Sequence, residues 1–79
     1  MSRLLVKFIS VWDGYGEVIS DAVFDDKSNT IFDIQVAALS DEELAECEIL
    51  LGEYIEFNDG TRVEVLINED TGAYIPCPF

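Results

Sequence analysis

The pattern of apolar and polar residues along the chain predicts six β-strands and one helix. Residues 3–12 are apolar on both faces, which is typical of a strand in the middle of a sheet. Residues 17–24 fit either a helical stripe or a strand, and their β-branched content favours the strand. Residues 30–36 are expected to return as the next strand. Three of their apolar residues are expected on one face: Phe32, Ile34 and Val36.

The helix is predicted over residues 40–51. Ser40 is a favourable N-cap, and Glu43 three residues later completes a capping box. Gly52 supplies the left-handed residue that commonly ends a helix. The segment has an apolar and an acidic side, which indicates an amphipathic helix. Leu44, Ala45, Cys47 and Leu51 can face a core, whereas Glu42, Glu43 and Glu46 line the opposite side.

A hairpin is predicted after the helix. Two alternating runs, 53–57 and 61–67, flank the Asn-Asp-Gly turn at residues 58–60. A three-residue loop with Gly60 in the left-handed region satisfies both faces of the two strands. The expected cross-strand pairs are Ile55 with Val63 and Glu56 with Arg62.

These elements predict a small α+β fold in a single domain, residues 1–79. Residues 73–75 can add a last short strand before Pro76 and Pro78 stop the pairing. The order of elements is then β-β-β-α-β-β-β. We therefore expect a mainly antiparallel sheet with the amphipathic helix packed on it.

The charge of the chain is strongly negative and unevenly distributed. The chain has four basic and seventeen acidic residues, which gives a net charge of -13. The segment between Lys27 and Arg62 contains nine acids and no base. These acids are Asp33, Asp41, Glu42, Glu43, Glu46, Glu48, Glu53, Glu56 and Asp59. Self-repulsion on this scale destabilises a compact fold, and solubility alone does not require such a base-free segment.

The composition argues against an enzyme. The chain has no histidine, which removes histidine-based triads and general bases, and its two cysteines form no CxxC pattern. We therefore expect no catalytic residue, no cofactor and no dedicated metal site. Cys47 is expected to be a buried structural thiol. Free thiols at Cys47 and Cys77 are favoured, with a disulfide between them as the alternative.

No apolar run approaches the ~20 residues that span a membrane. The N-terminal apolar stretch is interrupted by Lys7 and is not typical of a signal peptide. The expectation is a cytoplasmic protein that has no membrane partner and is a monomer.

The spacing of the acids raises the hypothesis of nucleic-acid mimicry. Carboxylates four apart on a helix, or two apart on one face of a strand, are about 6 to 7 Å apart. Such a row can imitate the phosphates of a DNA strand. The expected partner is a basic nucleic-acid-binding protein, and direct binding of nucleic acid is not expected. The candidate contact residues on and after the helix are Glu42, Glu43, Glu46, Glu53, Glu56 and Asp59.

One local stretch resembles a known family. Val11-Trp12-Asp13-Gly14, then Gly16, then Phe24-Asp25-Asp26 and Ser28 are similar to a stretch of an acidic phage-encoded anti-CRISPR protein, over about 18 of the 79 residues. DNA-mimicking members of that family occupy the lysine-lined surface where a Cascade-type complex takes up target DNA. The resemblance implies inhibition of type I CRISPR interference in a bacterial host. It adds Asp25 and Asp26 as candidate contacts.

Two other classes of function stay open. An immunity or antitoxin protein that neutralises a basic nuclease would have similar size and charge. A generic interaction module would instead bind through aromatic residues such as Trp12, Tyr15, Tyr54 or Tyr74, and its binding would survive high salt. Trp12 has an alternative role as a cap on a small core.

Overall fold

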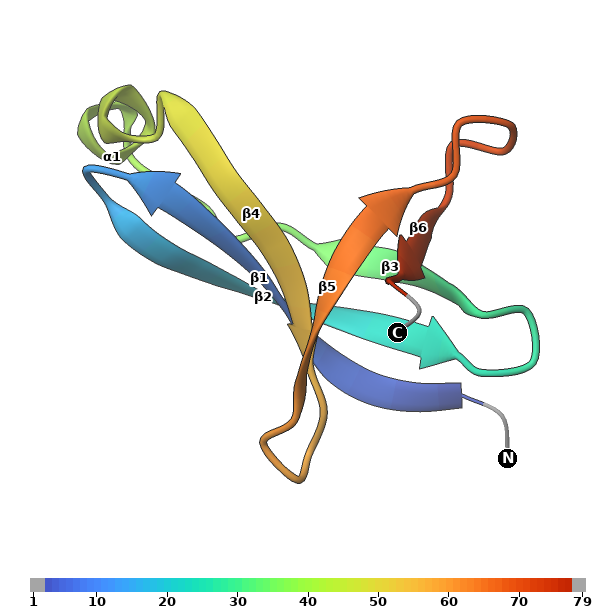
Figure 1. The fold of residues 1–79 in the computed structure, drawn as a ribbon. Helices are drawn as coiled ribbons and strands as arrows, with labels where there is room; N and C mark the ends of the chain where they lie inside the picture. Colours follow the sequence, from blue (N-terminus) through green and yellow to red (C-terminus); the bar gives the residue numbers. More distant parts are fainter. Residues whose placement is uncertain (1–2, 78–79) are drawn as a thin grey trace.

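The computed structural model describes residues 3–77 and is a closed antiparallel barrel of six strands in the order β1-β2-β3-β6-β5-β4 (Figure 1). A single short helix precedes β4. The strands are β1 (Arg3–Asp13), β2 (Gly16–Asp25), β3 (Thr30–Gln35), β4 (Ile49–Glu56), β5 (Arg62–Ile67) and β6 (Tyr74–Pro76), and the helix is α1 (Asp41–Glu46).

The predicted α+β fold, with a helix packed on a sheet, is wrong. β4 pairs with β1 as well as with β5, and β6 pairs with both β5 and β3. Each strand of the described chain therefore has two hydrogen-bonded neighbours, and the sheet closes on itself. Closure buries one face of every strand inside the barrel, so no sheet face is left for a helix to cover.

The helix is half as long as predicted. Its capping box is confirmed, because Ser40 Oγ accepts from the Glu43 N–H and the Glu43 carboxylate accepts from the Ser40 N–H. The helix ends at Glu46, however, and residues 49–51 join β4. There they find backbone partners opposite the end of β1, at Trp12 and Asp13. A full strand ladder outweighs one more turn of an acidic helix with like charges four apart.

Gly52 is therefore a strand residue and not the end of the helix. Its φ angle is not in the left-handed region, and it pairs with Val11 in the middle of the β1–β4 ladder. The Tyr54 ring lies over it: a Cβ on Gly52 would lie 2.9 Å from the Tyr54 hydroxyl oxygen. Glycine is required here by this close approach of an aromatic ring.

The predicted face of β3 is also wrong. The register of β3 against β2 shifts between Asp21 and Val23, and Asp33 has a φ of 54°. A bulge of this kind changes which residues point inward. As a result Ile31 is buried in the core and Ile34 packs against it, whereas Phe32 is exposed on the outside.

The other strand predictions are confirmed. Residues 17–24 lie within β2, and the β4–β5 hairpin has the predicted pairs Ile55 with Val63 and Glu56 with Arg62. Gly60 has a φ of 88°, as the three-residue loop requires. β6 extends one residue further than predicted, since Pro76 still pairs with Val65. Pro78 lies outside the described residues.

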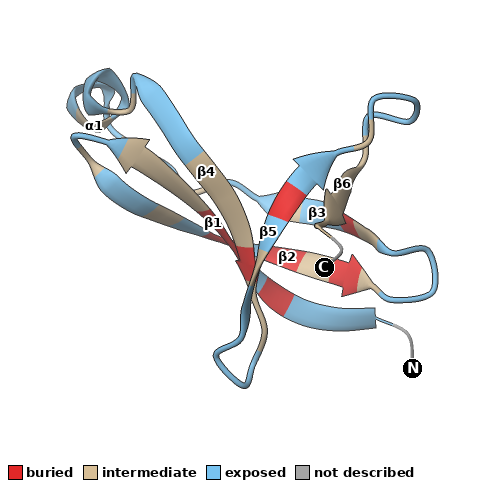
Figure 2. Ribbon diagram, viewed as in Figure 1, coloured by how far each residue is buried: buried red, intermediate tan, exposed pale blue. Residues whose placement is uncertain are grey.

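The packed core occupies one half of the barrel. Inward-facing residues of five strands form it: Val6, Phe8, Ala22, Phe24, Ile31, Ile55 and Val65. Two edge-to-face aromatic contacts close its sides, Phe8 with Tyr74 and Phe24 with Phe57. Figure 2 shows the buried segments gathered away from α1, which has no buried residue. The half of the barrel that ends at α1 is thus built differently from the other half.

Candidate acidic interface and helix-end cavity

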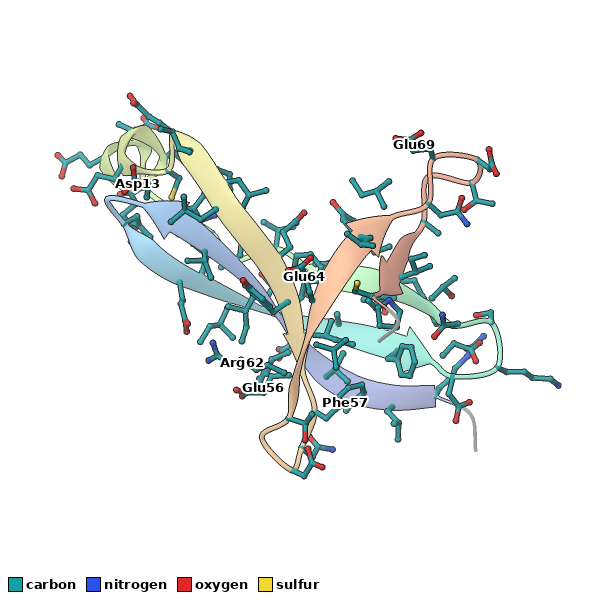
Figure 3. The ribbon with its side chains drawn as sticks, viewed as in Figure 1. Asp13, Glu56, Phe57, Arg62, Glu64 and Glu69 are labelled. Carbon is teal, nitrogen blue, oxygen red and sulfur yellow. The ribbon has the colours of Figure 1, made fainter. Side chains whose placement is uncertain are left out.

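Acidic side chains gather where α1 meets the turn between β1 and β2. We call this surface the acidic end. It consists of Asp13, Asp41, Glu42, Glu43, Glu46 and Glu48. Five of these six residues are exposed, and Glu43 is half-buried. Figure 3 shows Asp13 beside α1, at the opposite side of the molecule from Glu69.

The β1–β2 turn lies close to α1, and one side-chain hydrogen bond joins them. The Tyr15 hydroxyl donates a hydrogen bond of 2.6 Å to the Glu43 carboxylate. A Cβ on Gly14 would lie 3.8 Å from the Glu46 carbonyl oxygen, so the two segments are in van der Waals range. The hydrogen bond from Tyr15 and the bonds at Ser40 lower the pKa of Glu43. The same hydrogen bond raises the pKa of Tyr15. Glu43 therefore stays ionised while it fixes the helix in place.

The cations of the chain lie elsewhere. Lys7 pairs with Asp21 at 2.6 Å and Arg3 with Asp25 at 3.8 Å. Arg62 bridges two strands, with Glu17 at 2.8 Å and Glu56 at 3.0 Å. Lys27 lies in the β2–β3 turn. Within residues 3–77, no ion pair joins a lysine or arginine to the acidic end. Its negative charge is therefore uncompensated.

The eight acids predicted as contacts do not share one surface. Only Glu42, Glu43 and Glu46 lie together on α1. Glu56 is paired with Arg62 on the outside of the barrel, which Figure 3 shows at the base of the β4–β5 hairpin. Asp59 lies in the turn of that hairpin, where the Thr61 N–H lowers its pKa.

Asp25 and Asp26 lie at a third position, where β2 ends and its turn begins. Asp25 accepts from the Lys27 N–H and pairs with Arg3, whereas Asp26 is exposed. Conversely, Asp13, Asp41 and Glu48 belong to the acidic end but were not predicted as contacts. Asp13 could have been found, because a helix that follows a chain reversal can return to the turn of the first hairpin.

Glu53, the eighth predicted acid, points into the barrel. It pairs with Ser10 in the β1–β4 ladder and lines a cavity beneath α1. Desolvation by burial raises its pKa. The sequence contains a signal for this placement. Glu53 and Ile55 are two apart on one strand and so share a face, and the predicted pair of Ile55 with Val63 marks that face as apolar.

Cys47 lines the same cavity as a free thiol, half-buried rather than fully buried as predicted. Burial is the main cause that raises its pKa, so it is protonated and a poor nucleophile at neutral pH. Cys47 and Cys77 do not form a disulfide with each other.

Residues 3–77 contain neither a metal-binding cluster nor a membrane-spanning helix. No group of three or more potential ligand side chains within residues 3–77 is placed to hold a metal ion. The only helix of that part of the chain is far too short to cross a membrane.

Comparisons with protein-family models, with curated proteins and with solved structures found no match to this chain. What the protein binds must therefore be inferred from its own surface and cavity.

Proposed function

We propose that the protein is an inhibitor that uses its acidic end to occupy a lysine- and arginine-lined nucleic-acid-binding surface of another protein. It would exclude nucleic acid from that surface by competition and would not bind nucleic acid itself. The observation that carries the proposal is the uncompensated charge of the acidic end. Six carboxylates lie on α1 and the segments beside it without an ion pair, while three of the four cations pair with other acids.

The geometry of α1 fits this role. Glu42 and Glu46 are one helical turn apart, a separation of about 6 Å between neighbouring side chains, which approaches the spacing of phosphates along a strand. The Tyr15–Glu43 hydrogen bond anchors the helix, so these charges are held in place before a partner arrives. A preorganised acidic surface speeds association with a basic partner and loses less entropy on binding.

The local resemblance to an acidic anti-CRISPR protein makes a type I CRISPR surveillance complex the first partner to test. The matching stretch includes Asp13 and Gly14. These residues form the turn that lies against α1. Under this proposal the protein blocks the entry of target DNA and does not cleave or modify any component.

The experiment is a competition assay. A purified type I surveillance complex is pre-loaded with the protein, and its binding to target DNA is measured by gel shift at low and moderate salt. The proposal predicts loss of DNA binding at low salt and partial recovery as salt rises, because screening weakens the contact between the acidic end and its partner. DNA binding that is unimpeded across several such complexes would overturn the CRISPR assignment.

A second candidate, a generic interaction module, is favoured by exposed apolar residues beside the acidic end. Ile49 and Leu51, at the start of β4, are 57% and 63% exposed. A partner bound mainly through these residues would remain bound at high salt. Persistence of the complex at 0.5–1 M NaCl, where the Debye length falls to a few Å, would favour this second function.

A further inference from the structure

The barrel has a partly open cavity at the end where α1 lies, which we call the helix-end cavity. Its volume is about 390 Å³, within the range of small-molecule sites. Aliphatic side chains from β2, from β3 and from residues 36–47 form much of its wall. The cavity lies between the packed core and α1, where the inward residues of β1 and β4 are no longer all large and apolar. β1 changes from Phe8 to Ser10 and Trp12, and β4 changes from Ile55 to Glu53.

The cavity holds a single carboxylate, that of Glu53. Its neighbour on the same face, Ile55, is fully buried, so Glu53 occupies a position where a strand of a barrel normally carries an apolar residue. None of the four basic residues lines the cavity. In the described part of the chain, no ion pair neutralises Glu53. An acid placed inward without a cation breaks the pattern of the fold, and such breaks are expected at functional positions.

The other polar and aromatic groups of the cavity suit a positive charge. Ser10 lies directly opposite Glu53 in the β1–β4 ladder. Ser20 lies on β2, which pairs with the other edge of β1. Both hydroxyls can accept a hydrogen bond. Phe8, Trp12 and Tyr74 supply three aromatic rings, whose faces attract cations. A carboxylate combined with aromatic walls is the arrangement that recognises organic ammonium groups.

We infer that the helix-end cavity is a binding site for a small organic amine, with its ammonium group paired to Glu53 and its apolar body against the aromatic and aliphatic wall. The bound ammonium would supply the positive charge that the fold itself does not place beside Glu53. Burial of the Glu53 carboxylate, which raises its pKa, is consistent with a site that lacks its counter-charge.

The size of the cavity favours a free amine over a lysine or arginine side chain of a partner protein. A single inserted side chain would leave most of the volume of about 390 Å³ empty. A free amine with an aromatic body has more atoms than one inserted side chain and therefore fills more of this volume. This inference is independent of the proposed inhibitor function, since it uses the interior of the barrel and none of the six residues of the acidic end.

Trp12 provides a direct readout, because it is the only tryptophan of the chain and lines the cavity. Its fluorescence is followed during titration of the full chain with three probes of one shape: phenethylamine, 2-phenylethanol and phenylacetate. We expect phenethylamine to bind about tenfold or more tightly than the neutral alcohol, as one charge-assisted contact implies, and phenylacetate to bind more weakly than either. Equal binding of all three probes, or none, would overturn the inference.

Two variants test the role of the carboxylate. Glu53→Gln keeps the shape of the side chain and is expected to remove the preference for phenethylamine over 2-phenylethanol. Glu69→Gln makes the same change of net charge at an exposed residue far from the cavity and is expected to keep that preference. Loss of the preference in both variants would show that the amine responds only to overall charge, which would contradict the site.

A measurement on the unchanged protein covers the case in which Glu53→Gln does not fold. Two-dimensional NMR spectra with and without phenethylamine are expected to show the largest shifts at residues around the cavity, such as Ser10, Glu53 and Tyr74. Shifts confined to the acidic end would overturn the assignment. So would binding of a lysine- or arginine-containing peptide without binding of the free amine.

Discussion

The two halves of the barrel are built from the same strands but differ in the residues that point inward. In the half away from α1, inward positions are occupied by large apolar residues such as Phe8, Phe24 and Ile55, which are at most 8% exposed. Towards α1 the same strands carry Ser10, Ser20 and Glu53, and a cavity takes the place of a core. The outside differs as well: three of the four cations pair with acids elsewhere on the barrel, whereas the acids of the acidic end have no ion pair within residues 3–77. The hydrophobic core that stabilises the fold therefore lies in one half, and the cavity and the unpaired acids lie in the other.

Truncation of a core residue should give the largest change in the free energy of unfolding. Ile55→Ala removes a side chain with 0% exposure and is expected to lower the free energy of unfolding by about 3 kcal/mol. Val18→Ala, which enlarges the existing cavity, is expected to cost less than about 1 kcal/mol because little close packing is lost there. Urea denaturation followed by circular dichroism measures both. Equal costs for the two variants would abolish the distinction between the halves.

Replacing the carboxylate of the helix-end cavity should change the free energy of unfolding less, and in the opposite direction. Glu53→Leu replaces a partly desolvated carboxylate with an apolar side chain of similar size, and we expect the free energy of unfolding to rise by about 1 kcal/mol. Thermal unfolding is the measurement, with Glu69→Gln as the control for removal of one negative charge. A lower Tm for Glu53→Leu would indicate that the carboxylate stabilises the fold.

The smallest change in stability is expected from loss of the hydrogen bond that anchors the β1–β2 turn to α1. Tyr15→Phe removes the hydrogen bond to Glu43 and should lower the Tm slightly at pH 7. This hydrogen bond lowers the pKa of Glu43 in the folded state. Its contribution to stability is therefore fully present above the pKa of a glutamate in the unfolded chain, and it is lost as pH falls through the lowered pKa of the folded state. The difference in Tm between the two proteins should therefore vanish in acid. A difference that is independent of pH would point to packing rather than to this hydrogen bond.

Local features of the fold were predictable from the sequence. The register of the β4–β5 hairpin follows from the Asn-Asp-Gly turn, and the capping box at Ser40 and Glu43 fixes the start of α1. Both depend on residues close together in the chain, whose geometry is set by turn and cap chemistry.

Long-range features were not predictable in the same way. The β1–β4 pairing decides where α1 ends, since it draws residues 49–51 into a strand, and it joins segments about forty residues apart. The bulge at Asp33, which reverses the face of Phe32, has no local sequence signal beyond the β-pattern itself. Of the candidate site, Glu42, Glu43 and Glu46 on α1 were predicted as contacts, whereas Asp41 was not. The helix-end cavity was not predicted either, because it exists only once the barrel has closed.

The central claim, that the acidic end is the inhibitory surface, is tested most directly by two double variants in the competition assay. Glu42→Lys with Glu46→Lys, and Glu69→Lys with Asp70→Lys, each change the net charge from -13 to -9 at exposed positions. The account predicts that the first pair abolishes competition with target DNA for the surveillance complex, whereas the second pair leaves competition within about twofold of the unchanged protein. Equal loss in both variants, or loss in the second pair alone, would contradict it.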